Sequence, residues 1–253
     1  FFSDLNYQKA IEFFDKSLKY KQYDETYRAL AYYWKADALY RMKKYDKAIQ
    51  LYNTFLTTRG VIGLEEYGKA HYNLAYAKFK KEQYNDAGIW FRKYDEHVGN
   101  AKTKMHADAY NRIGDCYFVE SKFDAALTYY AKAADLELYD ADYSYYQKAV
   151  SQGRVRKYQQ KVQTLKQLKN KFPESQYKAE AIYEIGRTYH SNIENNKLAI
   201  DYYNKYVDDY PQGARVRSAL SSLANLYYNQ NKLNLSLETY KTVIAKFPGS
   251  NEA

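Results

Sequence analysis

The stretch that decides the fold is residues 73–87, NLAYAKFKKEQYNDA, because its pattern returns without a gap 39 residues later in residues 112–126, RIGDCYFVESKFDAA. Both stretches end on an alanine that follows an aromatic residue by three positions. A second aromatic residue follows that alanine by four positions. Internal repeats of this length are typical of stacked helical units, so the repeat is the natural starting point for predicting the fold.

Seven copies of this signature run through the chain, 35–39 residues apart. Five copies keep the alanine and the later aromatic residue: Ala10/Phe14, Ala48/Tyr52, Ala87/Phe91, Ala126/Tyr130 and Ala199/Tyr203. Two copies are degenerate: Lys161/Leu165 and Ser236/Tyr240. Spacing this regular over the whole length predicts one repeat array over residues 1–253.

Each copy is predicted to form two helices. Apolar or small residues recur at i, i+3, i+4 and i+7 in residues 110–117, which is typical of an amphipathic helix. A polar turn over residues 119–122 follows, and the second helix begins near Phe123. Small residues recur at one position of the first helices: Ala36, Ala75, Gly114, Ala149, Gly186 and Ala224. We expect them to face the small residues of the second helices, so that the two helices approach closely.

This pattern resembles the tetratricopeptide repeat (TPR) family, whose motif is W-x₂-L-G-x₂-Y followed by Ala, an aromatic residue and Pro. The best match is residues 110–117, YNRIGDCY, followed by Ala126 and Tyr130. The resemblance covers the whole chain and implies an all-α fold, a right-handed superhelical α-solenoid of about seven helix pairs. Both ends of the chain fall inside repeats, so we expect residues 1–253 to be an excerpt of a longer array.

Three links in the later copies carry proline at the family position: Pro173, Pro211 and Pro248. Residues 172–175 (FPES) and 247–250 (FPGS) are similar to links in bacterial cell-envelope TPR proteins of the β-barrel assembly lipoprotein and Tol–Pal coordinator type. Proline ends one helix, and we expect the serine to cap the next. The resemblance implies a role in bacterial cell-envelope assembly and favours a periplasmic or outer-membrane-associated location over the cytoplasm.

Composition argues against several classes of protein. Of the 253 residues, 46% are hydrophobic, which is enough for a packed core, and no apolar run approaches the roughly 18 residues of a membrane helix. The single cysteine, Cys116, excludes an internal disulfide, and we expect it to be buried and inert. His71, His97, His106 and His190 lack metal-ligand spacing, and no phosphate loop or nucleophile motif is present. We therefore expect no enzymatic activity, no metal and no cofactor.

The resemblance places ligand binding on a concave groove lined by the first helices. Its register gives fourteen candidate residues: Tyr33, Asp37, Tyr40, Tyr72, Tyr76, Phe79, Asn111, Asp115, Phe118, Tyr146, Tyr183, Arg187, His190 and Tyr228. Tyrosine, of which the chain has 33, offers a large contact area and a polar tip with few rotatable bonds. We therefore predict a scaffold that binds a protein or peptide segment in an aromatic groove. Packing between neighbouring repeats is the alternative role for the same residues.

The Lys and Asn clamp that some relatives use for C-terminal carboxylates is not supported. Its lysine-type positions hold Tyr33, Tyr72 and Tyr146, and its asparagine-type positions hold Asp37, Tyr76 and Val150. A segment with apolar anchors fits this groove better.

The charge distribution supports a second hypothesis. The formal net charge is +9, and residues 151–175 alone contribute +6. Their basic cluster of Arg154, Arg156, Lys157 and Lys161 is suited to an anionic ligand or nucleic acid. Charge elsewhere is nearly balanced, which disfavours nucleic acid. A third hypothesis is a structural spacer or self-association module.

Overall fold

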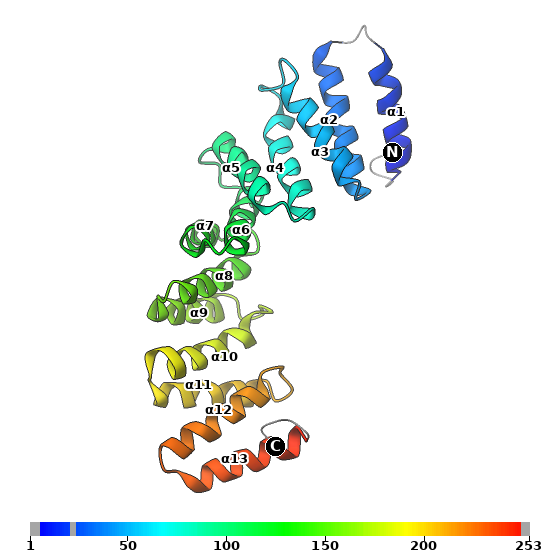
Figure 1. Ribbon diagram of the computed structural model, residues 1–253. Helices are drawn as coiled ribbons and strands as arrows, with labels where there is room; N and C mark the ends of the chain where they lie inside the picture. Colours follow the sequence, from blue (N-terminus) through cyan, green and yellow to red (C-terminus); the bar gives the residue numbers. More distant parts are fainter. Residues whose placement is uncertain (1–5, 21–23, 249–253) are drawn as a thin grey trace. The chain divides into compact units, whose positions relative to one another are not determined.

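The computed structural model describes residues 6–20 and 24–248, and these residues form 13 α-helices and one π-helical turn. The chain divides into two compact units, Phe1–Tyr139 and Asp140–Ala253. Figure 1 shows that hairpin-like helix pairs follow one another within each unit. The all-helical repeat predicted from the sequence is confirmed, whereas the single solenoid over residues 1–253 and its right-handed twist stay predictions.

Unit 1 begins with one helix and continues with three helix pairs. Its helices are α1 (Tyr7–Lys19), α2 (Glu25–Arg41), α3 (Tyr45–Thr57), α4 (Glu65–Lys80), α5 (Tyr84–Val98), α6 (Lys104–Val119) and α7 (Phe123–Leu136). Within the described residues, the first of the seven predicted copies therefore supplies only its second helix, α1. We number the pairs α2/α3, α4/α5 and α6/α7 as the first to third.

Unit 2 contains the fourth to sixth helix pairs. Its helices are α8 (Ala141–Arg154), α9 (Tyr158–Lys171), α10 (Lys178–Thr188), α11 (Asn196–Asp209), α12 (Val216–Asn229) and α13 (Leu233–Lys246). A π-helical turn, η1 (Tyr189–Ile193), continues α10. In both units each helix packs against the next one along the chain, so a second helix lies between two first helices.

The turn inside a helix pair has the same backbone in all six pairs. The signature alanine of the second helix is Lys161 in the fourth pair and Ser236 in the sixth. Five positions before this residue, each pair has a non-glycine residue with φ of 58–60°: Lys43, Glu82, Ser121, Arg156, Glu194 and Asn231. A residue in this left-handed region ends a helix and reverses the chain within a few residues. The geometry within a pair is therefore nearly constant, and the links between pairs take up most of the variation in repeat length.

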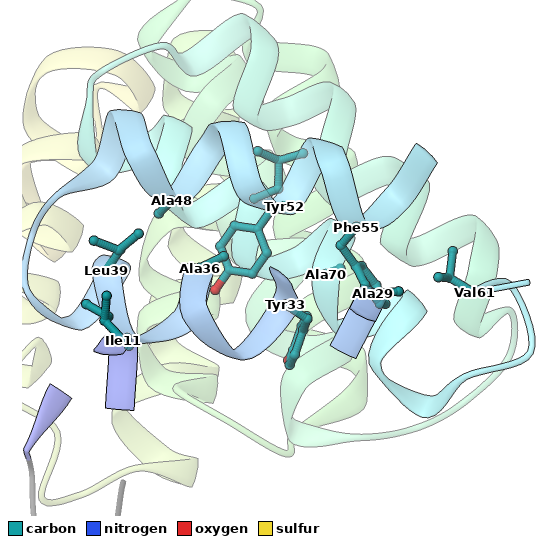
Figure 2. Packing of buried hydrophobic residues seen from close by; sticks show 12 residues of the cluster. Ile11, Ala29, Tyr33, Ala36, Leu39, Ala48, Tyr52, Phe55, Val61 and Ala70 are labelled. Carbon is teal, nitrogen blue, oxygen red and sulfur yellow. The ribbon is translucent and has the colours of Figure 1, made fainter. Parts of the chain in front are cut away.

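The small residues of the first helices make room for an aromatic ring and not, as expected, for another small residue. A Cβ atom on Gly114 would lie 2.7 Å from the Tyr130 ring. Figure 2 shows the same arrangement in the first pair, where the Tyr52 ring lies beside Ala36. Both tyrosines are at most 1% exposed, so the ring four residues after the alanine lies at the centre of its pair.

Ser175, the serine of the first FP-x-S link, was expected to cap the next helix, but it does not. Helix α10 begins at Lys178, and its N-cap residue is Tyr177. The Ser175 hydroxyl instead accepts a hydrogen bond from the Tyr177 backbone N–H at 3.1 Å and donates to Asp142 Oδ2 at 2.7 Å. Ser175 therefore ties the link to helix α8. The corresponding Ser250 lies outside the described residues.

Three further expectations concern chemistry. Across the described ranges, no helix is long and apolar enough to cross a membrane. In the same part of the chain, no group of three His, Cys, Asp or Glu residues could hold a metal ion. Cys116 is 2% exposed, and burial together with the Asp115 charge raises the pKa of its thiol to about 12. The thiol is therefore protonated and unreactive at neutral pH, as predicted.

Candidate binding site

The fourteen predicted groove residues differ widely in exposure. Five are buried (Tyr33, Asp37, Asn111, Asp115, Tyr183), seven are half-buried (Tyr40, Tyr72, Tyr76, Phe79, Phe118, Tyr146, His190), and two are exposed (Arg187, Tyr228). Tyr33, Asn111 and Tyr183 are at most 8% exposed and offer little surface to a ligand, so their role in binding stays a prediction. The rings of Tyr33 and Tyr183 pack against aromatic rings on the second helix of their own pair, α3 and α11.

Three of the half-buried aromatic residues pack against the first residue of the following helix. The ring pairs are Tyr40–Tyr45, Phe79–Tyr84 and Phe118–Phe123, with centroids 5.2–5.6 Å apart. His190 in the fifth pair meets the Tyr203 ring edge to face at 6.1 Å, and burial lowers its pKa. These four residues therefore pack within their own helix pair, whereas the alternative role given above is packing between neighbouring repeats.

A hollow of about 240 Å³ opens between the first helices α2 and α4. It is lined by Asp37, Tyr40 and Arg41 from α2 and by Tyr72, Asn73 and Tyr76 from α4. Asp37 Oδ2 accepts a hydrogen bond from Arg41 Nε at 2.8 Å, one helical turn away. The walls thus combine three phenol rings with one ion pair and one amide. We call this site the α2/α4 hollow.

Asp108 of α6 fixes two of the aromatic walls. The hydroxyls of Tyr72 and Tyr76 both donate to Asp108 Oδ2, the first at 2.6 Å. The two rings meet edge to face with centroids 4.9 Å apart. Burial, and after it the Asp108 charge, raises the pKa of both phenols, so both hydroxyls stay protonated and keep donating. Rings held in this way lose little conformational freedom when a ligand contacts them.

A further set of charge pairs supports Asp108. Arg112 Nε lies 3.4 Å from Asp108 Oδ1, and another nitrogen of Arg112 donates to Asp115. The Tyr130 hydroxyl donates to Asp115 Oδ1 at 2.7 Å. Because both aspartates are at most 8% exposed, these donors offset the free energy lost on removing the carboxylates from water.

In unit 2 the predicted residues fall in different surroundings. The Tyr146 ring stacks on Tyr177 at 4.9 Å, and burial raises the pKa of Tyr146 to about 12. Arg187 is exposed and donates two hydrogen bonds to Glu184. Arg187 also lines a second hollow, of about 320 Å³, together with Arg154 and Lys161. This α8/α10 hollow therefore joins one predicted groove residue to two members of the predicted basic cluster.

The other two members of the basic cluster lie elsewhere. Arg156 is the left-handed residue of the turn, and Lys157 is the N-cap residue of α9. Lys161 is 5% exposed, whereas its three companions are exposed. The cluster is therefore not one solvated basic face, because the helical period turns Lys161 inward.

Sequence reasoning missed Asp108, Arg41 and Asn73 as parts of the first hollow. Asp108 lies three residues before a predicted groove position, and it meets Tyr72 and Tyr76 across 36 and 32 residues of sequence. A single sequence carries no signal for a contact of that kind. The i,i+4 spacings of Asp37 with Arg41 and of Asp108 with Arg112 were the available hint.

Models of known families identify the repeat. Three models, each described as a tetratricopeptide repeat, match residues 2–60, residues 107–140, and residues 143–175, 180–213 and 218–250. The chain therefore belongs to the TPR family. Residues 61–106, which include α4 and α5, lie outside these matches but form the same kind of helix pair. No curated protein sequence matches this chain.

Solved structures share this fold at low sequence identity. The C-terminal part of a TPR repeat-containing protein from Cytophaga hutchinsonii is 20% identical with a TM-score of 0.76, covering 99% of this chain and 94% of that one. YrrB, described as a TPR protein with an unusual peptide-binding site, is 18% identical with a TM-score of 0.62, covering 90% and 97%. MamA from Desulfovibrio magneticus is 16% identical with a TM-score of 0.57, covering 72% and 97%. These likenesses establish the fold alone.

Proposed function

We propose that this chain is a non-enzymatic scaffold that binds an extended segment of a partner protein in the α2/α4 hollow. The observation that carries the proposal is the composition of this hollow, which the first helices of two successive pairs line with aromatic and polar side chains. First helices are the ones that face the ligand groove of a helical repeat array. Two of the aromatic walls are already fixed by Asp108, so the site is organised before a ligand arrives.

The chemistry of the walls suits a peptide. The rings of Tyr40, Tyr72 and Tyr76 offer apolar area to one side chain of the ligand. The Asn73 amide, whose Nδ2 donates to the Tyr33 hydroxyl at 3.2 Å, belongs to the class of side chain that pairs with a peptide backbone. An extended segment with one apolar anchor uses both features.

Two further points belong to the same proposal. YrrB is described as peptide-binding, and a related fold makes the same kind of ligand a reasonable choice here. The cell-envelope location inferred from the FP-x-S links is also part of the proposal, and cell fractionation with a specific antibody tests it separately.

The α2/α4 hollow can be tested by filling it. Peptides of 12 residues would be selected from a displayed random library on the immobilised chain, and their affinities measured by fluorescence polarisation. Asn73→Trp places a large ring inside the hollow, so we expect the selected peptides to bind about tenfold more weakly or worse. Gln50→Trp, on the exposed side of α3, is the matched control and should change nothing.

Circular dichroism of both variants checks that they are folded. Peptides that bind Asn73→Trp as well as the unchanged chain would refute the site. If their binding instead fell with salt and with Arg154→Gln, the basic-cluster hypothesis would replace this proposal.

A further inference from the structure

Three of the six residues that line the α2/α4 hollow are tyrosines, Tyr40 on α2 and Tyr72 and Tyr76 on α4. The hydroxyls of Tyr72 and Tyr76 both donate to Asp108, which belongs to α6. A phenol has one hydrogen to donate, so these two hydroxyls have none left for a ligand. What the two residues offer to a ligand is mainly the apolar ring.

All three rings are held in place by other aromatic rings. Tyr72 and Tyr76 pack against Phe91 of α5, with centroids 5.8 and 5.1 Å from its ring. Tyr40 packs against Tyr45 of α3 at 5.6 Å. Walls that are fixed from behind adapt little to the shape of a flexible side chain. They favour a ligand group that is itself rigid, because such a group loses little conformational freedom on binding.

The charged residues of the hollow neutralise each other. Asp37 and Arg41 are the acid and the base among its lining residues, and Asp37 Oδ2 accepts a hydrogen bond from Arg41 Nε at 2.8 Å. The Arg41 guanidinium also lies over the Tyr7 ring, 6.0 Å from its centroid. Because both ions already have partners, the hollow gives no advantage to a ligand side chain of either charge.

The neutral polar groups of the hollow suit a ligand that brings more acceptors than donors. None of the other described residues hydrogen-bonds to the Tyr40 hydroxyl, and burial raises the pKa of Tyr40 to about 12. This hydroxyl therefore stays protonated and can donate to a ligand carbonyl. The carboxylate of Asp37 is engaged by Arg41, so a ligand backbone N–H must compete for it. A buried N–H without an acceptor is unfavourable.

We propose that the α2/α4 hollow selects a proline of the bound segment, in a stretch of polyproline II conformation. This inference rests on the proposed function, because it names the side chain that the hollow takes. Proline is uncharged, its ring is rigid, and it has no backbone N–H. A polyproline II stretch has no internal hydrogen bonds, so its carbonyls are free to accept from Tyr40, and its preformed shape suits aromatic walls.

Other side chains meet fewer of these conditions. Leucine is apolar, but it brings a backbone N–H and loses rotamer freedom when it is buried. Phenylalanine could stack on the tyrosine rings, but it also brings a backbone N–H. Lysine can bind a tyrosine face through its charge. The carboxylate that would complete such a site, Asp37, is already paired with Arg41.

The test compares three blocked hexapeptides by ¹⁵N NMR titration of the whole chain. They are acetyl-Gly-Pro-Pro-Pro-Pro-Gly-amide and the same peptide with four leucines or with four N-methylalanines. We expect the proline peptide to shift the amide signals of Tyr40, Asn73 and Tyr76 and to bind about tenfold more tightly than the leucine peptide. The N-methylalanine peptide, which lacks both the N–H and the ring, should fall between them. A leucine peptide that binds as tightly as the proline peptide would overturn the proposal.

Variants of Tyr40 test the same assignment from the protein side. Tyr40→Leu keeps an apolar side chain without the ring or the hydroxyl, and it should weaken the proline peptide about tenfold. Tyr40→Phe keeps the packing against Tyr45 and removes the hydroxyl alone, so we expect a loss of about threefold. Tyr228→Leu is the matched control, because Tyr228 is the exposed residue at the same position of the sixth pair. Undiminished proline binding in Tyr40→Leu, shown to be folded by circular dichroism, contradicts the proposal.

Failure of this inference can be told apart from failure of the proposed function. Peptides from the random library that lose binding in Asn73→Trp, but contain no more proline than the library, would refute the choice of proline and leave the hollow as the binding site. Peptides that bind Asn73→Trp undiminished would refute both.

Discussion

In the second helix pair, α4/α5, Phe79 and Ala87 occupy the two positions that Gly153 and Lys161 occupy in the fourth pair, α8/α9. The turn between the helices has φ of 59° in both, at Glu82 and at Arg156. One backbone therefore holds an aromatic ring and an alanine in one pair and a glycine and a lysine in the other.

This difference shows what the repeat requires at the crossing of its two helices. The two side chains at the crossing change together, because interiors are close-packed and a larger residue is tolerated when its neighbour becomes smaller. Polarity is free to change only where a partner is supplied. Lys161 of the fourth pair has such a partner in Glu184, on the first helix of the fifth pair. For Ala87 of the second pair, the equivalent residue on the next first helix is Arg112 of the third pair.

The largest loss of stability is expected when a lysine is introduced into the second pair without the residues that accommodate Lys161 in the fourth pair. Ala87→Lys buries an ammonium group at a position with no exposed area, with Phe79 still in place and with Arg112 at the position of Glu184. We expect the free energy of unfolding to fall by more than about 4 kcal/mol, measured by urea denaturation. A loss below about 1 kcal/mol would show that the crossing does not exclude a lysine.

A matched pair of glycine substitutions comes next. In Gly114→Ala the new Cβ would lie 2.7 Å from the rigid, buried Tyr130 ring, so we expect a loss of about 2 kcal/mol in the free energy of unfolding. In Gly153→Ala the neighbour is the flexible Lys161 stem at 3.2 Å, and alanine favours the helix by about 1 kcal/mol. The second variant should be neutral or stabilised. Equal losses in both would remove the distinction between the two pairs.

A smaller effect is expected for Lys161→Met, which keeps the stem and removes the charge. Arg187 still neutralises Glu184, so we expect the free energy of unfolding to fall by about 1–2 kcal/mol. A double-mutant cycle with Glu184→Gln isolates the coupling between the two groups. A coupling energy near zero would mean that the buried contact adds nothing to stability.

The smallest effect concerns pH. The pKa of Glu184 in the folded protein lies below its ordinary value of 4.5, because the hydrogen bond from Arg187 and the charge of Lys161 outweigh the upward shift due to burial. The unfolded chain therefore binds this proton first as the pH falls. The stabilisation is complete well above pH 4.5 and is lost as the pH falls through the folded pKa. The difference in unfolding free energy between the unchanged chain and Glu184→Gln should shrink between pH 6 and pH 3. A constant difference would contradict the shift.

The fold was predictable because the repeat is a local pattern. The aromatic residue, the alanine and the second aromatic residue lie within eight positions, and their helical spacing alone sets which side faces the partner helix. Tyr52, Tyr130 and Tyr203 are buried as this spacing predicts. Tyr240, at the same position of the sixth pair, is half-buried. Its surroundings depend on what covers α13 and not on spacing alone.

The candidate site was predictable only in part. Register placed Tyr40, Tyr72 and Tyr76 on first helices, and the structure brings these three to one hollow. The register could not show that Tyr33 is buried, because its burial depends on how closely neighbouring helices approach. Nor could it show that Asp108 receives both tyrosine hydroxyls, since those contacts join different repeats.

The sequence by itself determined the period, the helix pairs and the turn within each pair, because these follow from residues that are near one another along the chain. The tertiary structure alone decided which polar groups meet. In the sequence, Lys161 is a departure from the alanine of the repeat signature. In the structure it lines a charged hollow together with Gly153, Glu184 and Arg187. That placement depends on packing between successive pairs, which linear spacing does not encode.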